Sequence, residues 1–195
     1  MGKIYYVMGK SAAGKDTVYQ ALLKSHPMLQ PLVAYTTRPK REGEREGESY
    51  HFVLEGELDR LKALGRVIEM RSYQTVEGIW QYATVDDGEI QLLEHSYLAI
   101  GTLESFEKIR DYFGRERVQA IYILLEDGLR LERALRREQQ RSKPGYAEMC
   151  RRYLADEADF SPENLKKAGI HTFYSNEDLE SCLLAIEGDL KEAVQ

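Results

Sequence analysis

Residues 9–17 read GKSAAGKDT and directly follow the apolar run IYYVM at residues 4–8. Gly9, Gly14 and Lys15 match a phosphate-binding loop, in which two glycines five positions apart precede a lysine and a hydroxyl residue. Asp16 stands at the hydroxyl position, and Thr17 comes one position later. Small residues let successive backbone N–H groups turn toward an anion, which the following helix N-terminus also favours. The stretch predicts a site for a nucleoside triphosphate or a similarly phosphorylated molecule; the alternative is a strand-to-helix turn that binds nothing.

The composition is that of an ordinary globular protein. The 195 residues, 43% of them hydrophobic and 31% charged, suffice for one well-packed α/β core with a small inserted lobe. Cys150 and Cys182 are too few for a disulfide framework, and no spacing of Cys and His indicates zinc. The first strand is expected from Lys3, which leaves no room for a signal peptide, and no apolar stretch approaches membrane-spanning length. We therefore expect a cytoplasmic protein without a membrane partner.

The charge of the chain is unevenly distributed. A net charge of −6 argues against a protein that coats nucleic acid, so we expect no nucleic-acid partner. One segment is nevertheless densely basic, and a local anion site explains such a segment better than a general polyanion surface. Its basic residues are Arg130, Arg133, Arg136, Arg137, Arg141, Lys143, Arg151 and Arg152.

The order of expected elements alternates between strands and helices. Strands are expected at residues 3–8, 32–36, 50–53, 66–73, 80–85, 97–101, 118–125 and 171–174. Helices are expected at residues 16–24, 57–64, 86–94, 129–140, 146–158 and 179–194. A turn near Gly78 joins the paired strands 66–73 and 80–85. Such alternation predicts an α/β fold with a three-layer parallel sheet and antiparallel strands inserted between about residues 35 and 85.

The expected insertion contains a second cluster with chemical meaning. Arg38 and Arg41 lie three positions apart on a loop that Pro39 stiffens, so both guanidinium groups can converge on one phosphate. The hydroxyl of Tyr50 can complete such a grip. The alternative is a charged surface loop in which arginine and glutamate side chains pair with each other.

Together these motifs resemble the guanylate kinase family of P-loop nucleoside monophosphate kinases. The resemblance spans roughly residues 3–190 and rests on the phosphate loop, on residues 36–44 with Tyr50-His51-Phe52, and on the arginine-rich helices. It implies a single P-loop α/β/α domain with an inserted mixed β lobe for the monophosphate and a helical lid. The core is expected at about residues 1–34, 86–128 and 160–195, the lobe at 35–85 and the lid at 129–159. The implied reaction moves the γ-phosphoryl of ATP to GMP or dGMP with Mg²⁺.

The resemblance also implies roles for individual residues. Lys15, Arg137, Arg141 and Arg152 match groups that act on the transferring phosphoryl. ATP is implied to contact Gly9, Ser11, Ala12, Ala13, Gly14, Lys15, Asp16, Thr17 and Asn176. GMP is implied to contact Thr37, Arg38, Arg41, Tyr50, Glu69, Tyr82 and Thr84. The Mg²⁺ ligands are expected to be Asp16 and Thr17.

Two of these assignments have a plainer explanation. Arg133, Arg137 and Arg141 recur every four positions and share one helix face, which could close over ATP or could simply be paired with glutamates such as Glu132 and Glu138. The carboxylate of Glu69 follows an apolar strand and needs a partner there. A guanine edge with two donors would satisfy it, and so would Arg71.

The chain departs from the family pattern at several positions. Asp16 replaces a serine, Ala34 replaces a polar residue that helps to read the base, and Ala99 and Gly101 replace an Asp-x-Asp pair. The residues expected to bind phosphate are retained, whereas several residues expected to contact the base and the metal ion are missing. The nucleobase preference is therefore left open. Asp16 can offset the loss as a Mg²⁺ ligand, or it can cap the helix.

Three hypotheses follow, from different classes. The first is a nucleoside monophosphate kinase for GMP or dGMP. The second is a kinase for another phosphorylated small molecule, because the Gly-Lys-Asp form of the loop is similar to that of ribose 1,5-bisphosphate phosphokinases. The third is a catalytically weak guanylate-kinase-like binding module, which the intact Gly14 and Lys15 argue against. The sequence does not distinguish a monomer from a homodimer.

Overall fold

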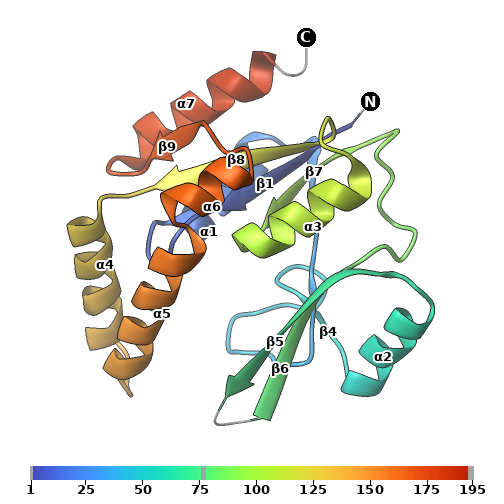
Figure 1. The fold of residues 1–195 in the computed structure, drawn as a ribbon, viewed down its shortest axis with the longest axis horizontal. Coiled ribbons are helices and arrows are strands. Elements are labelled where there is room, and N and C mark those ends of the chain that lie inside the picture. Colours follow the sequence, from blue (N-terminus) through green and yellow to red (C-terminus); the bar gives the residue numbers. More distant parts are fainter. Residues whose placement is uncertain (1, 76–77, 193–195) are drawn as a thin grey trace. The chain divides into compact units, whose positions relative to one another are not determined.

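The structure is a computed structural model that describes residues 2–75 and 78–192. The helices are α1 Lys15–Ser25, α2 Glu55–Ala63, α3 Leu103–Phe113, α4 Asp127–Gln139, α5 Tyr146–Asp159, α6 Pro162–Lys167 and α7 Leu179–Glu192 (Figure 1). The strands are β1 Ile4–Met8, β2 Leu29–Pro31, β3 Tyr35–Thr36, β4 His51–Phe52, β5 Val67–Thr75, β6 Gly78–Val85, β7 Ser96–Ile100, β8 Val118–Leu124 and β9 Phe173–Ser175.

The larger sheet has the strand order β2-β7-β1-β8-β9. All five residues of β1 are buried, as expected for the central strand of a sheet that is covered on both faces. β2 pairs with β7 and β8 pairs with β9, in both cases in parallel. The predicted α/β class with a parallel core sheet is confirmed, and β1 leads directly into the phosphate loop.

The smaller sheet has the strand order β4-β3-β6-β5 and is mixed. β3 runs parallel to β4, whereas β6 runs antiparallel to both β3 and β5. Helix α2 packs on this sheet through Leu58, which forms a buried cluster with Ala83 and Val85. The predicted mixed β insertion is therefore confirmed, with its own small apolar core.

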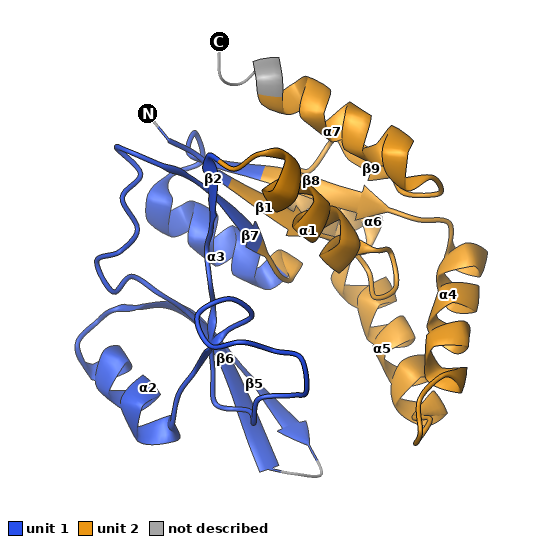
Figure 2. Ribbon diagram, turned by 180° about the vertical axis from the view of Figure 1, so that it is seen from behind, with its two compact units in different colours: residues 1–4, 28–99, 104–119 blue, residues 5–27, 100–103, 120–195 orange. Residues whose placement is uncertain are grey.

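The chain forms two compact units, which Figure 2 shows in different colours. Unit 1 comprises residues 1–4, 28–99 and 104–119 and contains the smaller sheet. Unit 2 comprises residues 5–27, 100–103 and 120–195 and contains the phosphate loop and helices α4 to α7. Each unit carries one part of the predicted site, and each part is described by itself below.

Two predicted elements are wrong. The strand expected at residues 32–36 is instead two strands, because the chain leaves the larger sheet after Pro31 and joins the smaller sheet at Tyr35. The helix expected at residues 86–94 does not form. There, the carboxylates of Asp86 and Asp87 accept hydrogen bonds from the N–H groups of Gly88 and Glu89, at 3.2 and 3.0 Å. Such local side-chain bonds favour turns over a helix.

Two helices were not predicted, although the sequence carries signals for both. In α3, Leu103, Phe106 and Ile109 recur every third position and are buried. In α6, the side chain of Ser161 accepts from the N–H of Asn164 at 3.3 Å and proline follows at the first helical position, a frequent start of a helix. The remaining predicted helices and strands form within a few residues of their expected bounds.

Parts of two predictions lie outside the described residues. These are the last two positions of the helix expected at 179–194 and the residues between β5 and β6, where the turn near Gly78 is expected. The structure describes α7 up to Glu192 and β6 from Gly78.

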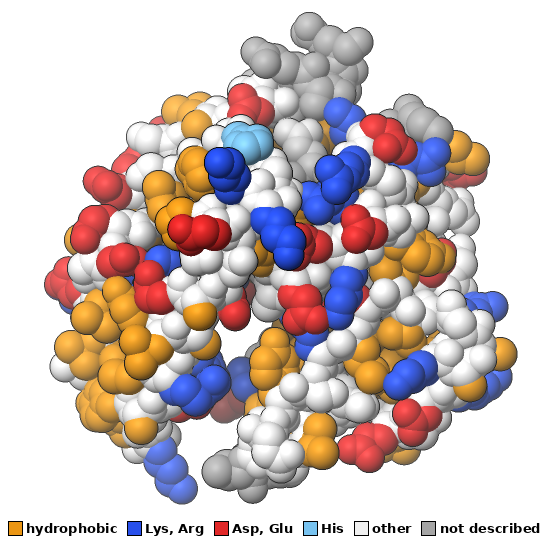
Figure 3. Space-filling model, viewed as in Figure 1, with side chains coloured by type: hydrophobic (Ala, Val, Ile, Leu, Met, Phe, Trp, Pro, Cys, Tyr) orange, Lys and Arg blue, Asp and Glu red, His pale blue; other side chains and the backbone are white. Residues whose placement is uncertain are grey.

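The surface carries side chains of both charges, and the two cysteines differ in their exposure. On the face of the described chain that Figure 3 shows, basic and acidic side chains are interspersed. In the described ranges, no helix is long and apolar enough to cross a membrane. Both cysteines are free thiols; Cys150 is exposed, while burial raises the pKa of Cys182 to about 11.

The core of the smaller sheet allows a test of its packing. Leu58 is 1% exposed, so Leu58→Ala should lower the free energy of unfolding by about 2–5 kcal/mol through lost burial and a residual cavity. Leu64, just after the same helix, is 58% exposed, and Leu64→Ala should change stability by less than about 0.5 kcal/mol. Chemical denaturation of both variants measures the difference. Equal losses would contradict the packing described here.

Candidate active site

The phosphate loop contains two glycines with positive φ, where another residue would be strained. Gly9 has φ 151°, and a Cβ atom there would lie 2.4 Å from the carbonyl oxygen of Ile123. Gly14 has φ 91°, and its Cβ would lie 2.2 Å from Nδ2 of Asn176. Among the described residues, Ala12 is the one non-glycine residue with positive φ, at 64°. Such a backbone costs about 1–2 kcal/mol and typically persists where function requires it.

Lys15 is the first residue of α1 and lies among charged groups. Burial of its ammonium lowers the pKa of Lys15, and the carboxylates of Asp16 and Asp156 oppose this effect. The guanidinium groups of Arg137 and Arg130 lower the pKa further. Lys15 thus lies among both cations and carboxylates.

Asp16 and Thr17 lie exposed in the first turn of α1. The residue at the N-cap is Gly14, and no side-chain hydrogen bond caps this helix in the structure described here. Asp16 still places negative charge near the helix N-terminus, where the dipole favours it. No group of three acidic, histidine or cysteine residues within residues 2–75 and 78–192 could hold a metal ion. One carboxylate and one hydroxyl fit Mg²⁺, which commonly takes its other ligands from phosphates and water.

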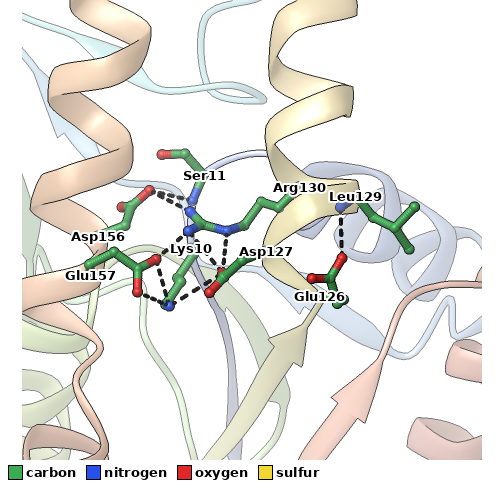
Figure 4. A network of polar contacts seen from close by, with 8 residues as sticks. All are labelled: Lys10, Ser11, Glu126, Asp127, Leu129, Arg130, Asp156 and Glu157. Atoms are coloured by element: carbon green, nitrogen blue, oxygen red, sulfur yellow. Dashed lines mark hydrogen bonds and ion pairs between the residues drawn. The ribbon is translucent and has the colours of Figure 1, made fainter.

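A charged network holds the loop against α4 and α5 (Figure 4). Nζ of Lys10 lies 2.7 Å from both carboxylate oxygens of Glu157 and 3.6 Å from Oδ1 of Asp127. The backbone N–H of Ser11 donates to Oδ2 of Asp156 at 2.7 Å. A carboxylate of α5 thus binds an N–H group of the loop itself.

Arg130 is the centre of this network and is only 1% exposed. Its Nη2 lies 3.1 Å from Oδ1 of Asp127 and also pairs with Glu157. Nη1 lies 3.6 Å from Oδ2 of Asp156, and the guanidinium carbon is 4.0 Å from the ring centre of Tyr153. Three carboxylates and an aromatic face thus compensate one buried cation. This network was not predicted from the sequence. The one signal for it was Lys10, a charged residue within a loop of small residues.

Predicted lid arginines lie around one pocket in unit 2. Its open volume is about 370 Å³, part of it continuous with solvent. The residues that line it are Ser11, Arg130, Ala134, Arg137, Glu138, Arg141, Glu148, Met149, Arg152 and Tyr153. The structure thus brings the predicted Arg137, Arg141 and Arg152 together with the predicted Ser11.

Glutamates hold two of the three predicted arginines. Nη1 of Arg141 lies 3.1 Å from Oε1 of Glu138, and Nε of Arg152 lies 2.8 Å from Oε1 of Glu148. Hydrogen bonds from Arg151 and Arg152 lower the pKa of Glu148 to about 2, against a smaller opposing effect of burial. Both partners of the Arg152–Glu148 pair are exposed, so this pair contributes little stability and can exchange readily. Arg141 is exposed, but its partner Glu138 is buried.

Arg133 and Asn176 do not line this pocket, and both contact backbone carbonyls instead. Arg133 donates to the carbonyl of Asn176 at 3.0 Å and to that of Glu177 at 3.3 Å. Asn176 is 4% exposed, and its amide donates to the carbonyl of Ala13 at 2.7 Å. Asn176 therefore supports the phosphate loop, and its predicted contact with adenine stays a prediction.

In unit 1, Arg38 pairs with Glu44, as in the alternative of a loop with paired arginine and glutamate side chains, and its role in binding a phosphate stays a prediction. Its guanidinium is buried and binds both carboxylate oxygens of Glu44, at 2.7 and 2.5 Å. The guanidinium carbon lies 4.9 Å from the ring centre of Tyr50. Arg41 donates its N–H to Glu44 at 2.8 Å, and its guanidinium lies over Trp80 at 5.9 Å. The hydrogen bond from Arg38 is the main reason that the pKa of Glu44 falls to about 2.

Tyr82 and Thr37 lie next to Arg38 and Tyr50. The ring centres of Tyr82 and Tyr50 are 5.7 Å apart. The pKa of Arg38 is raised, mainly by its hydrogen bond with Glu44, and a hydrogen bond with Tyr82 raises it further. The hydroxyl of Thr37 accepts from the N–H of Gln81 at 2.9 Å and thereby ties the loop to β6.

Glu69 lies in β5 with a side chain that is fully buried. Thr84 donates its hydroxyl to Oε1 of Glu69 at 2.8 Å, so the structure brings together the two predicted base-binding residues. Arg71 also binds this carboxylate, with Nε 3.0 Å from Oε2 and Nη2 3.2 Å from Oε1. Arg71 is therefore the partner that the sequence offered as the alternative to guanine.

The Arg130 network can be tested through stability. Arg130→Leu leaves three carboxylates without their shared cation and should destabilise the protein by about 3–5 kcal/mol. Arg136 is 72% exposed and pairs with Glu132 on the same helix, so Arg136→Leu should cost less than about 1 kcal/mol. Denaturant unfolding of both variants gives the comparison. If Arg130→Leu were as stable as the control, the network would not hold the loop and helices together.

A family model described as guanylate kinase matches residues 1–147. A guanylate kinase of Nostoc sp. is 31% identical over 193 residues, covering 95% of this chain and 88% of that protein. One from Trichormus variabilis is 30% identical with the same coverage. The crystal structure of guanylate kinase from Anaplasma phagocytophilum matches with a TM-score of 0.64 and 25% identity, covering 98% of this chain and 85% of that one. The chain belongs to the guanylate kinase family.

Proposed function

We propose that the protein transfers the γ-phosphoryl group of ATP to GMP or dGMP. The observation that supports this proposal is an intact phosphate loop in a member of the guanylate kinase family, together with Arg38 and Tyr50 in contact in the smaller-sheet unit. Phosphoryl transfer asks little covalent chemistry of the protein. It requires two phosphate groups to be positioned and their developing charge to be neutralised.

The ATP side of the reaction falls to the phosphate loop. Gly9 and residues 11–14 give the loop a backbone that can direct N–H groups toward the phosphates. Lys15 adds a cation for the charge that grows in the transition state. Asp16 and Thr17 would hold Mg²⁺, which supplies neutralisation of the phosphate oxygens when bound. The amide of Asn176 holds the loop by donating to the carbonyl of Ala13, and this residue is proposed to lie near adenine.

Arg137, Arg141 and Arg152 are assigned to the phosphoryl group in transfer. All three line the pocket that Ser11 of the loop also lines. Their guanidinium groups present planar sets of donors that match phosphate oxygens. Arg141 and Arg152 must exchange Glu138 and Glu148 for phosphate. The exchange costs little for the exposed Arg152–Glu148 pair, and the N–H of Gly145 remains as a partner for the buried carboxylate of Glu138.

The acceptor is assigned to the smaller sheet and its loop. Arg38, Arg41, Tyr50 and Tyr82 would hold the monophosphate, with Thr37 fixing the loop to β6. Glu69 and Thr84 would read the base, since a buried carboxylate needs donors and guanine offers two on one edge.

The division of the chain follows from these roles. We assign the core to about residues 1–34, 86–128 and 160–195, the monophosphate lobe to 35–85 and the lid to 129–159, within one domain. A cytoplasmic location, and partners limited to ATP and the nucleotide acceptor, complete the proposal.

The reaction itself is tested by ADP release from ATP with GMP, dGMP, AMP or ribose 1,5-bisphosphate as acceptor. Turnover is expected with GMP and dGMP. Lys15→Ala should reduce kcat by at least about a hundredfold while the protein stays folded, because the lost cation acts on transition-state charge. Lys24→Ala, an exposed lysine on the same helix, is the matched control and should leave turnover unchanged. Near-normal turnover in Lys15→Ala, or turnover with ribose 1,5-bisphosphate alone, would overturn the proposal.

The metal assignment is tested by Asp16→Ser, which restores the usual hydroxyl of this loop position. With the carboxylate gone, half-maximal rate should require a severalfold higher concentration of free Mg²⁺, since an anionic oxygen binds this ion more strongly than a hydroxyl. Asp59→Ser, an exposed aspartate of α2, should not shift the titration. Superimposable Mg²⁺ curves would remove Asp16 from the metal site and leave it a favourable charge at the helix N-terminus.

A further inference from the structure

Arg71 lies on the face of the smaller sheet that carries the proposed acceptor site. Across the β5–β6 pair, Glu69 lies opposite Thr84 and Arg71 lies opposite Tyr82. Residues two positions apart on a strand point to the same face, so all four form one continuous patch. The ring of Tyr82 in turn lies 5.7 Å from that of Tyr50. Arg71 therefore stands between the base-reading carboxylate and the phosphate grip.

The pairing of Arg71 with Glu69 uses both oxygens of the carboxylate. Nε binds Oε2 at 3.0 Å and Nη2 binds Oε1 at 3.2 Å, while Thr84 takes a further position on Oε1. The side chain of Glu69 is 0% exposed and that of Arg71 is 14% exposed. Water therefore has little access to this carboxylate, and a side-by-side pair of donors already satisfies it.

Guanine offers the same arrangement of donors as the arginine side chain. Its N1–H and its exocyclic amino group are joined through C2, as Nε–H and Nη2–H of arginine are joined through Cζ. Both fragments present two nearly parallel N–H donors that fit the two oxygens of one carboxylate. Guanine and Arg71 cannot bind this edge of Glu69 together.

We infer that Arg71 competes internally with guanine for Glu69 and thereby sets the affinity and base selectivity of the acceptor site. The inference rests on the proposed function, in which Glu69 reads guanine. When guanine binds Glu69, its two N–H donors replace the two donors of Arg71. The only free-energy cost at this carboxylate is that of moving the Arg71 side chain. Adenine has an acceptor at N1 and cannot restore both bonds, so the pair excludes it. Arg71 is thus a specificity-determining residue that does not itself need to contact the base.

The experiment is calorimetric titration of Arg71→Ala, Arg71→Gln and the unaltered protein with GMP and with ribose 5-phosphate. In Arg71→Ala the carboxylate of Glu69 has lost two of its donors, and guanine can supply both. The Kd for GMP should therefore fall by about tenfold or more, as expected for a hydrogen bond to a charged group. Arg71→Gln keeps one donor and should show a smaller fall. Ribose 5-phosphate, which has no base, should bind all three proteins equally, and the KM for ATP should not change. Arg66→Ala, from the residue just before β5, is the control.

The outcomes separate this inference from the proposed function. If the unaltered protein phosphorylates GMP but both Arg71 variants bind it no more tightly, the inference is wrong and the function stands. If no variant binds or phosphorylates GMP, the proposed function fails and the inference with it. Should Arg71→Ala fold poorly, the rise of its Tm with GMP should exceed that of the unaltered protein, because guanine restores the missing donors. An equal or smaller rise would overturn the inference.

Discussion

A cation that leaves water needs a negative partner, and this requirement shapes both parts of the candidate site. Arg130 is buried among the carboxylates of Asp127, Asp156 and Glu157, and Arg38 is buried against Glu44. These pairs hold the backbone segments that carry them, because breaking a buried pair costs several kcal/mol, about 3–5 in measured cases. Such ion pairs join the phosphate loop to α4 and α5, and they hold the loop that carries Arg38 and Glu44.

The same compensation defines what a phosphate ligand must do. Carboxylates now bind Arg38, Arg141, Arg152 and the N–H of Ser11. A phosphate that binds one of these groups replaces a carboxylate there. The displaced carboxylate stays in the protein, so its negative charge then needs water or another cation as a partner.

Much of the fold was predictable from local signals. The confirmed parallel sheet followed from apolar runs, and the glycines at 9 and 14 marked the turn after β1. The phosphate-binding roles of this loop and of Arg38 and Arg41 stay predictions. Residues 86–94 have the spacing of a helix, and this spacing does not reveal that the carboxylates of Asp86 and Asp87 bind neighbouring N–H groups and form a turn instead. The contacts of Lys10 and Ser11 with Glu157 and Asp156 join positions about 145 residues apart, and no periodicity in one sequence reports such pairs.

These distant contacts also bear on the order in which the protein is made. Ser11 and Ala13 of the phosphate loop contact Asp156 and Asn176, which lie 145 and 163 positions later in the chain. During synthesis the loop therefore emerges well before these two residues. A nascent chain that ends before Asn176 would lack the hydrogen bond from this side chain to the loop.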